Sequence, residues 1–285
     1  PAGVINIVTG RGSVIGNEMA GSPKVDIVSV TGSVSAGESI MKAAANNITK
    51  VSLELGGKAP AIVFPDADLE ASAQWILDSR IGNNGQICNN AERVYVHKDI
   101  KKEFTDILLR KFEAVKVGDP CKDHTVDMGP LVEKRALESV EAKVENAIKQ
   151  GAKVLCGGHR VGDKGYFYAA TLLDNCTQDM DIIHEETFGP VLPIVEFEDT
   201  DQVIAWANDV EYGLASSVFT KDIDTAAKVT RGLEFGETYI NREHFEAMQG
   251  FHAGVKKSGI GGADGKHGVE EYLVTHVTYL DTHYE

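Results

Sequence analysis

The sequence has few basic residues for its length, few cysteines and no long apolar run. Its 285 residues include 28 Lys and Arg against 43 Asp and Glu, which gives a formal net charge of −15 at pH 7. This acidic balance disfavours binding to nucleic acid or to an anionic membrane. Because no stretch of eighteen apolar residues occurs, we expect no membrane span. The 42% hydrophobic and 25% charged residues are typical of a folded protein with one large domain or two modest ones.

The few cysteines exclude further classes. They are dispersed, without CxxC spacing, at Cys88, Cys121, Cys156 and Cys176. This spacing disfavours a disulfide framework and a zinc site, so we expect no metal centre. It suits a reducing compartment, and we therefore expect a cytoplasmic protein in which one cysteine is a candidate nucleophile.

Apolar runs alternate with helix-like segments along the chain. The strand-like runs include VINIV (4–8), VDIVSV (25–30), VSLELGG (51–57), residues 59–64 and RVYV (93–96). Helical periodicity occupies residues 69–80, 100–115, 132–149 and 199–210. This alternation predicts an α/β fold with a parallel sheet. A last β-rich run, YLVTHVTY (272–279), is too isolated to form a sheet alone, so we expect it to join a sheet of this subunit or of a neighbour.

Three glycine clusters invite a nucleotide-binding interpretation. GRGSVIG (10–16) is one residue too long for GxGxxG, and we favour a simple turn into a helix. TGSVSAG (31–37) follows a strand and precedes a helix, so its backbone N–H groups and the Ser33 hydroxyl could hold a phosphate. GIGGADGKHG (259–268) fails as a P-loop because His267 stands where Ser or Thr is required.

Glu54 lies between two leucines in a predicted strand. It either faces the surface or is buried, and a buried carboxylate must be paired or have a raised pKa. A raised pKa is what a general base near neutral pH needs.

Cys88 follows a glycine in a polar loop, NGQICNN, whereas Cys156 sits in the apolar run AKVLC. A thiol in such a loop can be partly exposed and activated by backbone N–H groups, so Cys88 is the best nucleophile candidate of the four. The segment HEETFGP (184–190) is either a capped turn or part of a site.

These segments gain meaning from their order. LELGGK is followed by GQxC thirty-four residues after the glutamate, and EETFGPV comes about a hundred residues later. In order and spacing the sequence resembles the NAD(P)-dependent aldehyde dehydrogenase superfamily, over essentially its whole length. PAGVINIVTG and YGLASSVFT also resemble its members. GETYINREHFEAMQGFHAG and KKSGIGGADGKHG are most similar to the branch that acts on lactaldehyde and glycolaldehyde.

The resemblance implies a covalent mechanism. Cys88 would attack the aldehyde carbon to give a thiohemiacetal, whose oxyanion is held by the Cys88 N–H and by an upstream Asn that this sequence lacks. After hydride transfer, Glu54 would activate the water that hydrolyses the thioester.

The same resemblance assigns a cofactor site. Glu186 would bind the nicotinamide-side ribose, and Phe188 would lie beside the nicotinamide. Gly32 and Ser33 would contact the pyrophosphate, and Leu55 would lie on the nicotinamide-facing turn. The expected cofactor is NAD, with NADP left open because the segment that discriminates them is absent.

The resemblance also places three polar residues, Asn89, Glu246 and His252, near the mouth of the aldehyde tunnel. Polar groups there favour a short, hydroxylated aldehyde such as lactaldehyde or glycolaldehyde, because a site built for a hydroxyl leaves its own groups unpaired with an analogue that lacks one. Alternatively, each is a solvated loop residue.

By this resemblance, residues 1–55 form the later part of a NAD-binding domain, 56–258 the catalytic domain and 259–285 a tail with an oligomerisation strand. We therefore expect a fragment of a longer enzyme that forms dimers or tetramers. Other aldehyde or semialdehyde dehydrogenases and a non-catalytic structural homologue stay as alternatives. Glu54 argues against a phosphorylating or CoA-acylating relative, since a water-activating base serves hydrolysis.

Overall fold

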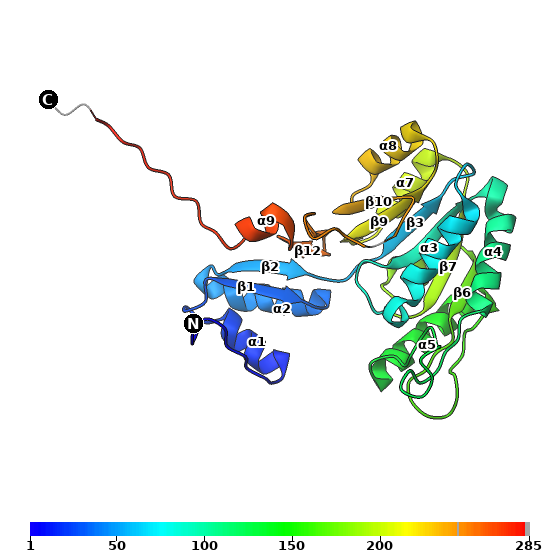
Figure 1. The fold of residues 1–285 in the computed structure, drawn as a ribbon, viewed down its shortest axis with the longest axis horizontal. Coiled ribbons are helices and arrows are strands. Elements are labelled where there is room, and N and C mark those ends of the chain that lie inside the picture. The colour runs from blue at the N-terminus through cyan, green and yellow to red at the C-terminus, as the bar shows by residue number, and fades with distance from the viewer. Residues whose placement is uncertain (244, 283–285) are drawn as a thin grey trace.

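A computed structural model describes residues 1–243 and 245–282, in which two sheets of different size stand side by side (Figure 1). The larger sheet has seven strands in the order β10-β9-β3-β4-β7-β6-β5, parallel except for β5 against β6. Its strands are β3 (Ala59–Val63), β4 (Ala91–His97), β5 (Lys153–Cys156), β6 (Thr171–Cys176), β7 (Val191–Phe197), β9 (Ala215–Phe219) and β10 (Glu237–Ile240). The predicted α/β fold with a parallel sheet is confirmed.

Helices cover both faces of the larger sheet. They are α3 (Leu69–Ile81), α4 (Lys101–Glu113), α5 (Lys134–Gln150), α6 (Asp181–His184), α7 (Thr200–Asn208) and α8 (Ile223–Gly232). Successive strand residues point to opposite faces, so Val94 and Val96 pack in the core with α3 and α4. Tyr95, between them, packs in the core with α5 to α8. Because both faces are covered, these strands are apolar almost throughout.

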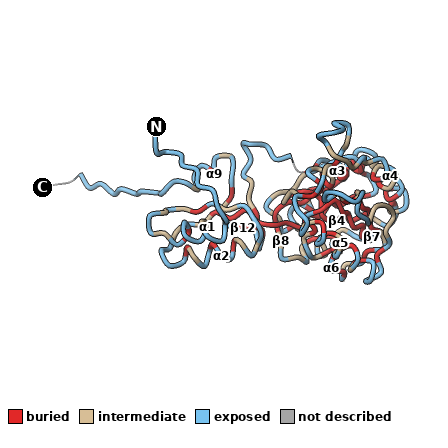
Figure 2. Tube along the Cα trace, turned by 90° about the horizontal axis from the view of Figure 1, so that it is seen from below, coloured by how far each residue is buried: buried red, intermediate tan, exposed pale blue. Residues whose placement is uncertain are grey.

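The smaller sheet has the order β1-β2-β12, with β1 (Ile27–Thr31) parallel to β2 (Lys50–Glu54) and β12 (Gly259–Ile260) antiparallel to β2. Helices α1 (Gly12–Ala20) and α2 (Val34–Ala44) pack with it around a small core that includes Ile40 and Leu53. The remaining short elements are β8 (Tyr212–Gly213) paired with β11 (Val255–Lys256), α9 (Gly265–Glu270) and the 3-10 turns η1 (Ala45–Asn47), η2 (Gly82–Gly85) and η3 (Lys98–Ile100). Buried residues are concentrated around the larger sheet (Figure 2).

One predicted strand does not form. VINIV (4–8) is irregular and exposed, with Ile5 at 84% of its full exposure, and no described strand pairs with it. The run 272–279 extends away from both sheets and pairs with no described strand of this subunit (Figure 1), so its pairing with a neighbouring subunit stays a prediction. An apolar alternating run becomes a strand only where a neighbouring strand satisfies its backbone groups. In the described ranges, no helix is both long and apolar enough to cross a membrane.

Candidate active site

The site lies where the smaller sheet joins the larger one. Glu54 is the last residue of β2, and residues 55–58 run directly into β3. A Cβ on Gly57 would clash with the carbonyl oxygen of Cys88, and a Cβ on Gly56 would lie 2.6 Å from Oε2 of Glu186. The two glycines therefore allow the Cys88 loop and the Glu186 turn to close on the segment that follows Glu54.

The Cys88 loop is held by the end of α3. Asn83 and Asn84 adopt left-handed φ angles of 46° and 59°, which breaks the helix and turns the chain back. Arg80 is fully buried and donates to the carbonyl oxygens of Gly85 at 2.7 Å and Ala91 at 2.7 Å. The loop thus presents Cys88 half-buried, as the sequence predicts for a nucleophile.

Two of the other cysteines differ from Cys88. Burial raises the pKa of the Cys156 thiol to about 11 and that of Cys176 to about 12. Both are therefore protonated thiols near neutral pH, with little nucleophilic character.

Glu54 is buried, which rules out the surface-facing alternative. Its side chain is 11% exposed, and neither carboxylate oxygen accepts a hydrogen bond from the described residues. Desolvation raises its pKa to about 7; nearby His252 opposes the rise, and Glu237 adds to it. A carboxyl group that titrates near neutral pH is suited to general-base catalysis.

His252 lies between Glu54 and a second carboxylate. Its Nδ1 is 2.9 Å from Oε1 of Glu237, and its Nε2 is 3.5 Å from Oε2 of Glu54. The nearby Cys88 and Glu237 side chains raise the His252 pKa to about 11. His252, expected at the tunnel mouth, thus lies within 3.5 Å of Glu54.

The other two predicted substrate residues contact each other. Nδ2 of Asn89 donates to Oε2 of Glu246 at 3.2 Å. Asn89 is buried, so it is not the solvated loop residue of the alternative interpretation, whereas Glu246 is exposed.

The turn after α6 carries the two residues expected next to the nicotinamide. Oε1 of Glu186 accepts a hydrogen bond from the Gly57 N–H at 2.8 Å. Burial, and then the nearby charge of Glu92, raise the Glu186 pKa to about 7. Phe188 adopts a left-handed φ of 52° and is 41% exposed. The turn therefore presents a carboxylate and an aromatic ring beside the segment that follows Glu54.

A buried ion cluster supports this turn. Oε2 of Glu92 is 2.7 Å from Nζ of Lys58, and its Oε1 is 2.9 Å from Arg80. Glu92 also accepts the N–H groups of Thr187 at 2.9 Å and Phe188 at 3.1 Å. Although burial alone would raise the Glu92 pKa, the two cations lower it to about 2.

Lys58 responds in the opposite way to its ion partner. Burial lowers its pKa to about 8, because the attraction of Glu92 is outweighed by desolvation and by the nearby Arg80 and Arg93 charges. One carboxylate is shared among several cations, so the charged form of Glu92 is stabilised more than the charged form of Lys58. The sequence does not single out this cluster, because Glu92 lies next to the charged Arg93, whereas Glu54 lies between two leucines.

The predicted phosphate contact lies at the start of α2. The Ser33 hydroxyl accepts the N–H of Ala36 at 3.2 Å as an N-cap, and the Gly32 N–H donates to the Glu54 carbonyl oxygen at 3.0 Å. Both residues are exposed, so a ligand can reach them. Leu55 is buried in the small core, and its N–H donates to the Ser258 carbonyl oxygen at 2.8 Å. The β2 end is therefore tied to the α2 turn.

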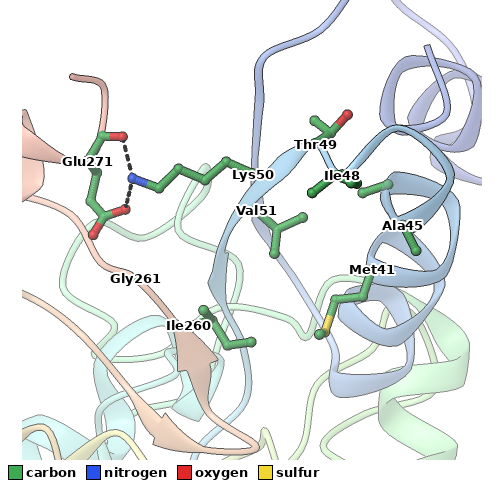
Figure 3. Close-up of a pocket in the computed structure, with 10 residues that line it drawn as sticks. Met41, Ala45, Ile48, Thr49, Lys50, Val51, Ile260, Gly261 and Glu271 are labelled. Atoms are coloured by element: carbon green, nitrogen blue, oxygen red, sulfur yellow. Dashed lines mark hydrogen bonds and ion pairs between the residues drawn. The ribbon is translucent and has the colours of Figure 1, made fainter. Parts of the chain in front are cut away.

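A groove of about 590 Å³ lies elsewhere, between α2 and β12 (Figure 3). Met41, Ile48 and Ile260 line it, and an ion pair of 2.8 Å between Lys50 and Glu271 lies at its side. It contains none of the predicted site residues, so it is separate from the Cys88 site.

Comparison with known proteins supplies the family context. A model of the aldehyde dehydrogenase family matches residues 1–278. Lactaldehyde dehydrogenase from Escherichia coli (strain K12) is 58% identical over 282 residues, which cover 99% of this chain and 59% of that protein.

Solved structures agree. The crystal structure of lactaldehyde dehydrogenase from Escherichia coli matches with a TM-score of 0.94 at 59% identity, covering 96% of this chain and 57% of the other. Betaine aldehyde dehydrogenase from Staphylococcus aureus, solved in complex with NAD⁺, matches with a TM-score of 0.90 at 39% identity. The match covers 94% of this chain and 54% of the other. The chain thus spans less than two thirds of the length of these relatives.

Proposed function

Because the chain belongs to the aldehyde dehydrogenase family, we propose that its protein oxidises a short, hydroxylated aldehyde such as lactaldehyde or glycolaldehyde to the carboxylic acid with NAD. The observation that carries this proposal is the position of the buried Glu54 carboxylate, three residues before the Gly57 that packs against the Cys88 backbone. A half-buried thiol and a carboxylate with a pKa of about 7 are the nucleophile and base that acyl-enzyme hydrolysis requires.

The chemistry divides between these two side chains. Cys88 Sγ attacks the aldehyde carbon, a C–S bond forms, and the carbonyl electron pair moves to oxygen, next to the Cys88 N–H. Glu186 and Phe188 would hold the NAD that supplies the hydride acceptor, and the adduct on Cys88 would thereby become a thioester. Glu54 takes a proton from water, the hydroxide adds to the thioester carbon, and the C–S bond breaks to release the acid.

The cofactor would be held along the junction of the two sheets. The Glu186 carboxylate would bind ribose hydroxyls, and Phe188 would lie beside the nicotinamide ring. Gly32 and Ser33, exposed at the start of α2, would contact the pyrophosphate, and Leu55 would shape the nicotinamide side. NADP in place of NAD is an outcome of the test.

Substrate choice would depend on the polar residues around Cys88. The buried Asn89 amide, held by Glu246, offers hydrogen bonds to a substrate hydroxyl, and His252 offers a third polar group. An aliphatic aldehyde of the same length would leave these groups unpaired.

The wider setting is proposed on the same resemblance. Residues 1–55 would belong to a NAD-binding domain, 56–258 to the catalytic domain and 259–285 to a tail whose extended run joins a second subunit of a dimer or tetramer. A cytoplasmic location is supported by the four cysteines, all of which are free thiols.

The test follows NADH absorbance at 340 nm with protein expressed from its complete gene. We expect kcat/KM for glycolaldehyde or lactaldehyde to exceed that for propanal by about tenfold or more, as one or two hydrogen bonds provide. Cys88→Ala should fall below about 1% of the parent rate, while Cys121→Ala, at an exposed cysteine, should not change it.

Three outcomes would redirect the proposal. A preference for propanal would favour another aldehyde or semialdehyde. A rate that requires CoA or phosphate would indicate an acyl-transferring relative. No NADH or NADPH formation with any aldehyde would leave the non-catalytic homologue.

A further inference from the structure

We propose that Glu92 and Lys143 are positioning residues for the cofactor, which hold the main chain of residues 186–188 from two sides in the conformation that binds NAD. The inference rests on the proposed function, which assigns Glu186 to the ribose and Phe188 to the nicotinamide ring. Both positioning residues would act through this turn, because both contact its main chain.

The turn 186–188 has no regular structure of its own. Helix α6 ends at His184, and β7 begins only at Val191. Phe188 has a left-handed φ of 52°, which is unfavourable for a residue with a large side chain. Such a conformation persists only where the surroundings hold it. Contacts from outside the turn must therefore fix the Glu186 carboxylate and the Phe188 ring in place.

Glu92 supplies the first of these contacts. Its Oε2 accepts the Thr187 N–H at 2.9 Å, and its Oε1 accepts the Phe188 N–H at 3.1 Å. The fully buried Lys58 and Arg80 pair with the same two oxygens at 2.7 and 2.9 Å, so the carboxylate has little freedom to turn away. One rigid carboxylate thus holds two successive N–H groups of the turn.

Lys143 supplies the second contact, from helix α5. Its Nζ donates to the Glu186 carbonyl oxygen at 2.6 Å and pairs with the Glu185 carboxylate at 3.2 Å. The helix packs closely on the end of the turn, because a Cβ on Gly189 would clash with the Val140 side chain. The α5 surface therefore holds the turn on the side of this carbonyl group.

The two contacts meet at one peptide group. The Glu186 carbonyl oxygen, bound by Lys143, and the Thr187 N–H, bound by Glu92, belong to the same peptide bond. That bond is trans, so its oxygen and its N–H point to opposite sides of the chain. A rotation of this peptide plane would break both hydrogen bonds at once. The pair of charged side chains therefore fixes the plane from which the Glu186 side chain departs.

The direction of the Glu186 side chain is what a ribose would meet. Its Oε1 accepts the Gly57 N–H at 2.8 Å, whereas Oε2 accepts no hydrogen bond from the described residues and stays open to a ligand. If the turn adopted other conformations, the apparent Kd for the cofactor would rise by the factor by which the binding conformation is depleted. Glu92 and Lys143 would thus set cofactor affinity without touching the reacting atoms.

The first experiment titrates NADH and NADPH by fluorescence in protein expressed from its complete gene. Lys143→Met keeps the length of the side chain and removes the donor, and we expect it to raise the Kd about tenfold. Lys149→Met, at an exposed lysine of the same helix, should leave the Kd unchanged. Glu185→Gln removes the exposed ion partner of Lys143 but not its contact with the carbonyl oxygen, and should also leave it unchanged.

The second experiment needs no cofactor. Hydrogen exchange of the free protein, measured on peptides that contain residues 186–188, should be about tenfold faster in Lys143→Met and in Glu92→Gln than in the parent. Glu92→Gln also unpairs Lys58 and Arg80, so Lys143→Met is the decisive variant. In the described part of the chain, the polar contacts of Lys143 are confined to Glu185 and Glu186, so alkylation of Cys88 by iodoacetamide should keep the parent rate in Lys143→Met.

The outcomes decide between a positioning role and a structural one. A Kd for Lys143→Met within about twofold of the parent value overturns the proposal, even if Glu92→Gln fails to fold. Exchange that is unchanged at the turn, or accelerated equally over the whole larger sheet, overturns it as well. Faster exchange confined to the turn, in a protein that binds neither NADH nor NADPH, would show that the two residues hold the turn and that the proposed function fails.

Discussion

Replacing Glu92 with glutamine should lower the free energy of unfolding by about 3–5 kcal/mol, which is the cost of removing one partner from a buried ion pair. The substitution keeps the side-chain volume and removes the only carboxylate that contacts Lys58 and Arg80 in the described ranges. All three side chains are at most 1% exposed. Water therefore cannot replace the lost charge.

The pKa of Glu92 gives a similar magnitude. A fall from 4.5 to about 2 corresponds to about 3 kcal/mol at neutral pH. Lys58 can relieve part of the strain by losing its proton, since its pKa is already about 8, but Arg80 cannot. The glutamine amide would also point N–H groups at one of these donors.

The sign of the pH dependence follows from the same shift. Because the folded-state pKa is below the unfolded value, the Glu92 contribution is complete above about pH 4.5 and is lost as the pH falls toward 2. The difference in free energy of unfolding between the parent protein and Glu92→Gln should therefore be about 2 kcal/mol smaller at pH 3 than at pH 7.

Urea unfolding measures both effects, through the midpoint at constant slope. Glu70→Gln is the control, because Glu70 pairs with Arg110 at the surface and its loss should leave the urea midpoint almost unchanged. Adding Lys58→Met to Glu92→Gln should recover about 1 kcal/mol or more by removing an unpaired cation. The reasoning would be refuted if Glu92→Gln lowered the free energy of unfolding by less than about 1 kcal/mol at pH 7, or by the same amount at pH 3 as at pH 7.

Two further predictions concern carboxyl groups whose pKa burial raises to about 7. A carboxyl group can act as a base only when deprotonated, so with Glu54 as the proposed base kcat should rise with pH to about 7 and then level off. Glu54→Gln should reduce kcat at least about 100-fold and abolish this rise. A persisting rise in that variant, seen by stopped-flow NADH measurement, would assign it to another group. Glu186→Gln should raise KM for NAD about tenfold or more, as loss of a charged hydrogen bond implies, whereas Glu185→Gln, at the exposed neighbour, should not; equal steady-state KM values for the two would contradict the ribose assignment.

Local pattern predicted much of the fold. The strands β1 to β4 and the helices α3, α4, α5 and α7 lie where alternation or helical periodicity placed them, because each buries the face that its own sequence makes apolar. The run 4–8 has the same alternation and forms no strand. Its pattern contains no information on whether a partner strand is within reach, and pairing is what makes a strand.

The site divides in the same way. Cys88 and Glu54 could be selected because each contrasts with its immediate neighbours, the one in a polar loop and the other between leucines. The contact between Glu237 and His252 could not be predicted, since the two residues are 15 apart in the chain and meet only because β10 and the segment paired with Ala263 pack together. Contacts of this kind depend on tertiary packing and leave no mark in local sequence.

The four residues 55–58 give the site a mechanical property. Glu54 belongs to the smaller sheet, whereas Cys88, Glu186 and Glu237 belong to the larger one, so any rocking of one body on the other changes the reach of the base. The buried Ser258 stiffens this joint: its hydroxyl donates to the Gly56 carbonyl oxygen at 2.7 Å and accepts the Gly213 N–H at 2.8 Å. In the proposed mechanism the reach of Glu54 depends on this short hinge, so a substitution there, remote from the thiol, should alter turnover while leaving the reacting groups intact.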